Sequence, residues 1–165
     1  MPLRVNLMAG RDNIDLMESM TELVVARQFS APKNAVWAAF VEPEIIAQWW
    51  GPDGWLVEED SVVFEAKVGG RHELNMVQAD NPDAKVPLKA VLTSFDEYEC
   101  LVSADGPHEM TLDLVIETRI EFKEFAGQTM LTLTQTPLPY EVIESSTKAW
   151  NSAFAKLEAL LAEFF

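Results

Sequence analysis

The segment that decides the fold is the last one in the chain, YEVIESSTKAWNSAFAKLEALLAEFF at residues 140–165. Its apolar residues recur without interruption at the spacing of an α-helix, which no other long segment matches. At about 100° per residue, six of them fall within a stripe about 80° wide: Ile143, Trp150, Phe154, Leu157, Leu161 and Phe164. The pattern predicts one long helix whose apolar stripe is covered by the rest of the chain.

Two prolines, Pro137 and Pro139, stand just before this helix, and we expect them to end any preceding strand. From Trp55 to these prolines the hydrophobic period alternates, as is typical of strands. The runs predict strands over about 56–64, 71–78, 88–95, 97–104, 110–124 and 129–136. Turn-forming residues between them predict turns at 69–70, 79–87, 105–107 and 126–127.

The run over 110–124 gives the clearest register. Its apolar residues share one face with Thr118, and they are Leu112, Leu114, Ile116, Ile120 and Phe122. Charged residues between Asp113 and Lys123 occupy the other face. We therefore expect one face of the sheet to contact solvent, as in many antiparallel sheets.

The N-terminal part supplies one more strand and two short helices. Residues 21–29 are rich in β-branched and apolar side chains and predict a strand. Helical spacing over 32–41 and again over 42–50 predicts two helices, each with a proline near its start. Residues 1–20 show no sustained period, and we interpret them as an arm attached to a single domain over 21–165.

Together these elements predict an α+β fold. Short links between consecutive strands favour an antiparallel sheet of about seven strands, with the helices gathered on one side. A twisted sheet of this width curls, and the C-terminal helix fits its concave face.

The composition excludes some classes of partner. Lys and Arg number 12 against 27 Asp and Glu, a formal net charge of −15 that repels nucleic-acid backbones and anionic lipid surfaces. No apolar run is long enough for a membrane span and no signal-peptide pattern is seen, so we expect a cytoplasmic protein without membrane insertion. One cysteine, and two histidines without the spacing of a zinc site, indicate no disulfide, metal or cofactor.

Four groups of residues, in the right order, carry a family resemblance. They are RQFSAP at 27–32, Val36-Trp37 with Glu42-Pro43 and QWWGP at 48–52, EAKVGGR at 65–71, and residues 129–135 followed by Trp150. With these motifs the chain resembles the START-like, or SRPBCC, superfamily. Within it, the chain resembles the activators of the heat-shock-protein-90 ATPase and their single-domain bacterial relatives. Glu65, Lys67 and Ala149 stand where that family usually has Asp, Arg and Gly.

The resemblance implies a helix-grip, or Bet v 1-like, fold, in which a curved sheet grips the long helix and a cavity opens between them. Members of the superfamily carry lipids, bind hormones, act as polyketide cyclases or aromatases, or serve as co-chaperones, so the fold does not choose a function. Activators of the ATPase usually have an additional N-terminal domain, and residues 1–20 are too few for one.

His72 is the one candidate for proton transfer. It shares strand parity with Leu74 and Met76, the expected inward face, so its ring is either a polar group inside an apolar cavity or reaches solvent or a backbone carbonyl. His108 falls in an expected turn and is interpreted as a surface residue. No catalytic motif accompanies either histidine, so the sequence does not decide whether the protein is an enzyme.

Two adjacent tryptophans, Trp49 and Trp50, point about 100° apart if both are helical. We expect one to pack inward and the other to cap the mouth of a cavity or an interface. Trp55 follows a turn and adds to that rim. The alternative is ordinary core packing of all the tryptophans.

The first functional hypothesis is a small apolar or amphipathic molecule held between the C-terminal helix and the sheet. The expected cavity residues are Trp49, Trp50, Trp55, His72, Leu74, Met76, Leu92, Leu114, Ile116, Thr118, Ile143, Thr147, Trp150 and Phe154. The alternatives are an enzyme of the cyclase or aromatase type in the same cavity and a co-chaperone of the heat-shock-protein-90 ATPase. Pairing into a homodimer through the arm or a sheet edge also stays open.

Overall fold

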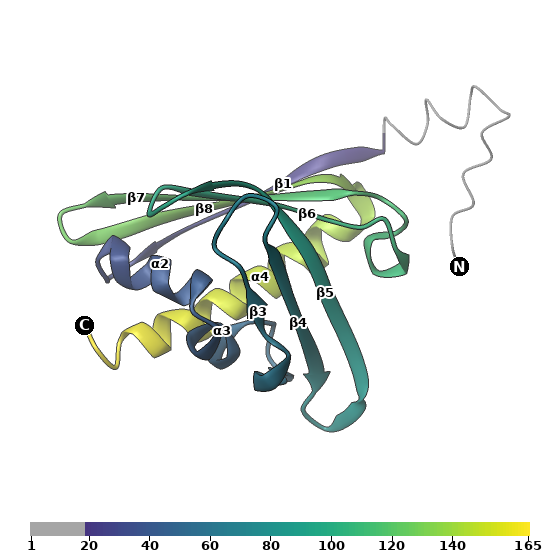
Figure 1. Cartoon of the computed structure of the whole chain (residues 1–165), viewed down its shortest axis with the longest axis horizontal. Helices are drawn as coiled ribbons and strands as arrows, with labels where there is room; N and C mark the ends of the chain where they lie inside the picture. The colour runs from purple at the N-terminus through teal and green to yellow at the C-terminus, as the bar shows by residue number, and fades with distance from the viewer. Residues whose placement is uncertain (1–18) are drawn as a thin grey trace, which may run out of the picture.

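The computed structural model describes residues 19–165 (Figure 1). Its strands are β1 (Met20–Phe29), β2 (Trp55–Val57), β3 (Val63–Phe64), β4 (Arg71–Gln78), β5 (Asn81–Asp96), β6 (Cys100–Asp105), β7 (Ile116–Phe125) and β8 (Gln128–Pro139). Its helices are α2 (Lys33–Val41), α3 (Pro43–Trp49) and α4 (Tyr140–Leu161). The predicted order of a strand, two short helices, a run of strands and a long helix is confirmed.

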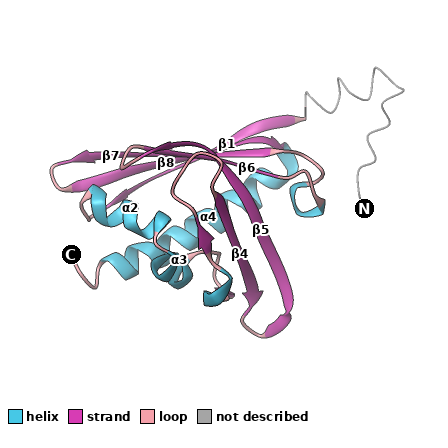
Figure 2. Cartoon of the chain, in the orientation of Figure 1, coloured by secondary structure: helices cyan, strands magenta, loops and turns pink. Residues whose placement is uncertain are grey.

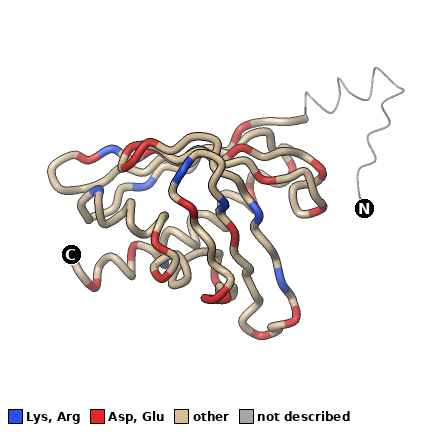
Figure 3. Tube along the Cα trace, in the orientation of Figure 1, with Lys and Arg blue, Asp and Glu red and all other residues tan. Residues whose placement is uncertain are grey.

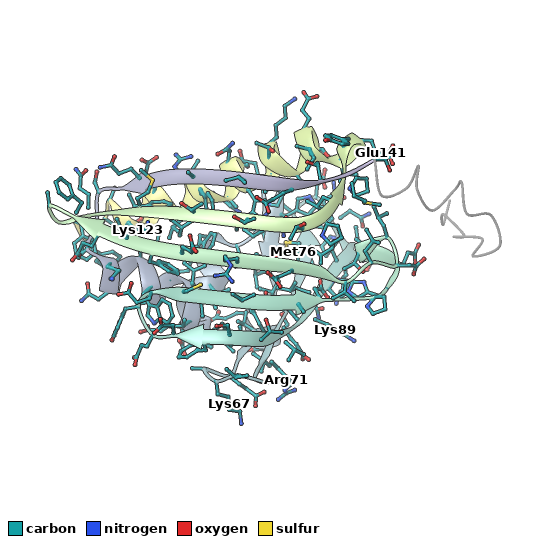
Figure 4. All side chains as sticks on the ribbon, turned by 90° about the horizontal axis from the view of Figure 1, so that it is seen from above. Lys67, Arg71, Met76, Lys89, Lys123 and Glu141 are labelled. Carbon is teal, nitrogen blue, oxygen red and sulfur yellow. The ribbon has the colours of Figure 1, made fainter. Side chains whose placement is uncertain are left out.

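The strands form one curved antiparallel sheet. Within the described residues their order is β1-β8-β7-β6-β5-β4-β2, and β3 pairs with β4. All three helices lie against one face, around which β4 and β5 bend (Figure 2). Figure 4 looks onto the opposite face. The sheet therefore has one helix-covered face and one open face, as predicted. Acidic and basic residues are spread along the chain rather than gathered on one element (Figure 3).

Helix α4 supplies the centre of the core. It packs against β1, β8 and the two short helices, and the side chains of Phe154 and Leu157 are fully buried. The ring of Phe154 meets that of Phe29 edge-on at 5.9 Å between centroids. The helix ends at Leu161, so the prediction that it continues to the end of the chain is wrong there, and Phe164 is exposed.

The predicted strand over 56–64 is wrong in its middle, where Glu59–Ser61 form a 3-10 turn between β2 and β3. The Ser61 hydroxyl donates a hydrogen bond to the carbonyl of Glu58 (2.6 Å) and accepts one from the backbone N–H of Asn75 (2.8 Å). The Ser61 side chain thus takes the place of a backbone acceptor for the Asn75 N–H. The alternation of apolar residues does not reveal this interruption of the strand.

Strand β5 begins at Asn81, so the turn expected over 79–87 is largely strand. Up to Lys89 this strand pairs only with β4, because its pairing with β6 starts at Ala90. The early half of β5 is therefore an edge, where Pro82 and Pro87 are tolerated without a second neighbouring strand.

The same geometry explains why Pro137 and Pro139 do not end β8, contrary to prediction. The strand runs to Pro139, and α4 begins at the next residue. Its pairing with β7 stops at Thr136, so the last three residues of β8 have only β1 beside them. Proline has no backbone N–H to donate, and here no second strand lies beside these prolines to accept such a hydrogen bond.

Two predicted strands begin later than expected. Residues 97–99 form a turn before β6, with Tyr98 at φ +65°. The strand expected over 110–124 starts only at Ile116, because Glu109–Thr111 form a 3-10 turn and Leu112 and the next residue have positive φ. The Thr111 hydroxyl holds this turn by bonding to the backbone N–H and carbonyl of His108. Leu112 is exposed rather than inward-facing.

The expected arm over 1–20 lies almost entirely outside the described residues, although Met20 already belongs to β1. The division into an arm and a domain over 21–165 stays a prediction. Among the described helices, none combines the length and apolarity that a membrane crossing requires.

Candidate functional site

A cavity of about 60 Å³ lies between the concave face of the sheet and the helices. Strands β3 to β8 all contribute to it, together with α2, α4 and the residue that follows α3. Its lining residues are Phe40, Trp50, Phe64, His72, Leu88, Leu92, Leu101, Ser103, Thr118, Ile120, Gln135 and Trp150. Most of these side chains are apolar, and none of them is an acid, a lysine or an arginine.

Three uncharged polar residues form a row across the inner face of the sheet. Ser103 on β6 is paired with Thr118 on β7, and Thr118 is paired with Gln135 on β8. Residues directly opposite each other on antiparallel strands project from the same face, so all three side chains lie together. The row gives an otherwise apolar cavity one polar wall.

Helix α4 is tied to this row by hydrogen bonds. The indole N–H of Trp150 donates to Gln135 Oε1 (3.0 Å), and Gln135 Nε2 donates to the hydroxyl of Thr118 (3.0 Å). An indole can only donate, so the contact fixes which amide atom of Gln135 faces the helix. Trp150, Gln135 and Thr118 therefore form one chain of hydrogen bonds from the helix to the sheet.

His72 stands elsewhere in the cavity wall, on β4. The residue is 7% exposed, and its ring contacts those of Phe64 and Trp50 at centroid distances of 5.2 and 5.1 Å. Burial lowers the pKa of His72 to about 4, so the imidazole is neutral at pH 7. The Nε2 atom is buried and has no hydrogen-bond partner among the described residues. Of the two sequence-based interpretations, the inward one is correct.

A second, more open cleft of about 140 Å³ adjoins the same two tryptophans. It is lined by Trp50, Gly51, Pro52, Met76, Ala149, Trp150 and Ala153. The rings of Trp50 and Trp150 meet edge-on at 5.5 Å between centroids and line both the inner cavity and the outer cleft. This tryptophan pair is therefore the wall shared by the two spaces.

The structure brings together six of the residues expected from sequence. Trp50, His72, Leu92, Thr118 and Trp150 line the inner cavity, and Met76 lines the outer cleft. The remaining eight line neither space, and they are Trp49, Trp55, Leu74, Leu114, Ile116, Ile143, Thr147 and Phe154. Leu74 and Phe154 are fully buried core residues, and Leu114 precedes β7 rather than belonging to it.

The adjacent tryptophans behave differently from the helical expectation. Trp49 is buried, and its indole N–H donates to the carbonyl of Ala39 (2.8 Å). Trp50 already has extended backbone angles (φ −61°, ψ 139°) because α3 ends before it. Both rings can therefore turn inward, and only Trp50 reaches the cavity.

Sequence reasoning missed seven lining residues, namely Phe40, Phe64, Leu88, Leu101, Ser103, Ile120 and Gln135. A signal existed for Gln135, which is a polar residue that follows Leu131 and Leu133 at the same inward parity. Ser103 gave no such signal, because its role depends on pairing with Thr118 across two strands.

The site offers no paired acid and base. His72 is the one ionisable side chain in the lining, and no carboxylate, lysine or arginine stands beside it there. The other histidine, His108, is bonded to Asp105 (2.7 Å) away from this cavity. Among residues 19–165, no cluster of His, Cys, Asp and Glu side chains is arranged to hold a metal ion.

A curved antiparallel sheet that grips a C-terminal helix, with a cavity between them, defines the helix-grip class of START-like proteins. Residues 30–162 match the sequence profile of the family described as "Activator of Hsp90 ATPase homolog 1-like protein". The chain belongs to this family, as its motifs predicted. No functionally curated protein gives a significant match.

Solved structures of bacterial proteins have the same fold. A protein of Chromobacterium violaceum is 21% identical with a TM-score of 0.75, over 84% of this chain and 95% of its own. A protein of Nitrosomonas europaea is 19% identical with a TM-score of 0.73, over 86% and 94%. The AHSA1 protein of Silicibacter pomeroyi is 22% identical with a TM-score of 0.70, over 88% and 100%. At these identities the likeness shows the fold alone.

Proposed function

We propose that the protein binds a small apolar or amphipathic molecule in the cavity between α4 and the sheet. The observation that supports this proposal best is the composition of the inner cavity. Apolar side chains from β3, β5, β6 and β7 and from the helical segments converge there with a few uncharged polar groups, which is the composition of small-molecule sites. The apolar walls would hold the body of the ligand, and the polar groups would orient it.

The size of the cavity limits the ligand. Pockets for drug-sized molecules are roughly 300–1,000 Å³, whereas the inner cavity is about 60 Å³. The outer cleft of about 140 Å³ shares Trp50 and Trp150 with it, so a shift of these two rings would join the spaces. Since an apolar cavity of about 150 Å³ holds one benzene, a molecule built on a single ring fits this site better than a long lipid.

Thermal unfolding with toluene as the probe tests the proposal. A ligand that binds only the folded protein raises its melting temperature. We expect toluene to stabilise the wild type, and Ser103→Val to abolish the effect because the added methyl groups occupy the cavity. Ser94→Val, the same substitution at an exposed position of β5, is the matched control and should respond like the wild type. An unchanged melting temperature of the wild type, or equal responses in all three proteins, would contradict the proposal.

A further inference from the structure

The Nε2 atom of His72 is a fully buried polar atom in the cavity wall that the protein leaves without a hydrogen bond. Among the described residues it is the only buried side-chain nitrogen or oxygen without a hydrogen-bond partner. Buried polar atoms are nearly always bonded, because an unmade hydrogen bond is costly in an apolar environment. The residue also belongs to the lining of the inner cavity. A group of a bound ligand is the natural partner for this atom.

The surroundings of His72 restrict the charge of that group. The ring contacts of His72 are with Phe64 and Trp50, and no other residue of the lining is ionisable. Because burial lowers the pKa of His72 to about 4, the imidazole carries no charge at pH 7. A carboxylate or an ammonium group would lose its hydration without finding a counter-ion, which strongly disfavours binding. The partner group is therefore uncharged.

The chemistry of imidazole restricts the group further. A neutral imidazole has one nitrogen that donates and one that accepts, and Nε2 takes either part depending on the tautomer. A hydroxyl group can donate to one tautomer and accept from the other, so it satisfies His72 in both. The outer cleft of about 140 Å³ suits an aromatic body, and a shift of the Trp50 and Trp150 rings would let the hydroxyl on that body reach His72 in the inner cavity.

We propose that the cavity selects an uncharged phenol-like molecule, with its hydroxyl group bonded to His72 Nε2 and its ring against Trp50 and Trp150. This inference rests on the proposed function, because it names the class of ligand for the same site. It assigns His72 the part of a binding residue, with no proton transferred.

Isothermal titration calorimetry at pH 7 with three probes of one ring each tests the inference. The probes are p-cresol, toluene and benzoate, which share a ring and differ in carrying a hydroxyl group, a methyl group alone or a negative charge. With a pKa near 10, as for tyrosine, p-cresol is neutral under these conditions. We expect wild-type protein to bind p-cresol about tenfold more tightly than toluene, the size of effect that one satisfied hydrogen bond supplies. Benzoate should not bind detectably.

Substitutions test whether the preference for p-cresol over toluene depends on His72. His72→Leu should bind p-cresol and toluene equally, His72→Gln should keep part of the preference, and His108→Ala, at the other histidine, should behave like the wild type. Equal affinities in the wild type, or an undiminished preference in His72→Leu, would overturn the inference while leaving the proposed function intact. Absence of binding by both p-cresol and toluene would overturn both. The comparison of probes on the wild type decides the matter even if the His72 variants fail to fold.

Discussion

At the scale of single residues, the feature that stands out is His72, a buried imidazole with an unpaired nitrogen. Its ring is enclosed by Phe64 and Trp50, and its Nε2 atom receives no hydrogen bond. The missing hydrogen bond destabilises the folded protein. A bound ligand that supplied this hydrogen bond would offset the loss.

Burial of His72 should make the stability of the protein depend on pH. Its pKa is about 4 in the folded state and 6.5 ordinarily, so between these values the unfolded chain binds more protons than the folded one. The free energy of unfolding should therefore fall as pH decreases from 6.5 to about 4, by roughly 3 kcal/mol in total for this residue. Urea unfolding at several pH values measures this loss.

The contribution of His72 to this loss is isolated by substitution. We expect His72→Leu to lose less stability than the wild type between pH 6.5 and 4, because its carboxylates still titrate but its buried imidazole is gone. His108→Ala should keep the full loss. If His72→Leu and the wild type lost stability in parallel, the imidazole would have to be solvated in the folded protein.

The paired glycines before β4 give a second prediction at this scale. A Cβ atom on Gly70 would collide with the backbone carbonyl of Glu65 and lie 2.8 Å from that of Lys67. Gly69 has φ +82° but no atom within 4 Å of such a Cβ. We expect Gly69→Ala to cost about 1 kcal/mol through its left-handed backbone, and Gly70→Ala to cost more than about 2 kcal/mol because two backbone segments must move. Chemical denaturation measures the free energy of unfolding of both variants. A larger loss for Gly69→Ala than for Gly70→Ala would mean that the loop over 65–70 has another conformation.

At the scale of elements, α4 is joined to the sheet in two ways. Its second half packs through fully buried side chains such as Phe154 and Leu157. Its first half is less buried and meets the sheet through the hydrogen bond from Trp150 to Gln135. Trp150 also lines the cavity, so the polar link positions the part of the helix that borders it.

Removing that link should destabilise the protein without disturbing the packing greatly. Trp150→Phe keeps an aromatic ring but leaves Gln135 Oε1 without its donor, and we expect a loss of about 1–3 kcal/mol. Gln135→Leu alone should cost less, and the double variant should be more stable than the sum of the two losses predicts. Strict additivity in a double-mutant cycle would show that the two side chains are not coupled.

Elements with a strong hydrophobic period could be predicted from sequence. The start of α4 at Tyr140 and the bounds of β4 at 71–78 agree with their patterns, because apolar residues recur along each element at a regular spacing. The ends of β5 and β8 could not be predicted, since the prolines in them are tolerated only where one neighbouring strand is absent. That information belongs to the pairing of strands and not to the strand itself.

The residues of the candidate site also divide into those that the pattern of one strand predicts and those that depend on the pairing of strands. His72, Leu92 and Thr118 could be placed on the inward face by counting residues along their strands. Ser103 and Gln135 join the site because the register sets them directly opposite Thr118. Counting within one strand can place Gln135 on the inward face, but it does not give the register between strands, so the row as a whole could not be predicted.

At the scale of the whole molecule, the helix does not fill the curve of the sheet evenly. Helix α4 packs against β1 and β8 (Figure 1). The cavity, by contrast, is lined largely by residues of β4, β5, β6 and β7. Trp50 and Trp150 stand between this cavity and the outer cleft. The fold thus leaves a small space inside, and the two tryptophans that line it also border the outer cleft.

The most direct test of this account follows the indole N–H signals of the tryptophans by NMR during titration with p-cresol. We expect saturable shifts of the Trp50 and Trp150 signals, because their rings line both spaces. Trp37 lines neither and instead borders a separate groove beside α2, so its signal should stay in place. Shifts confined to Trp37, or no saturable shift of any indole signal, would contradict the claim that a small ligand binds between α4 and the sheet.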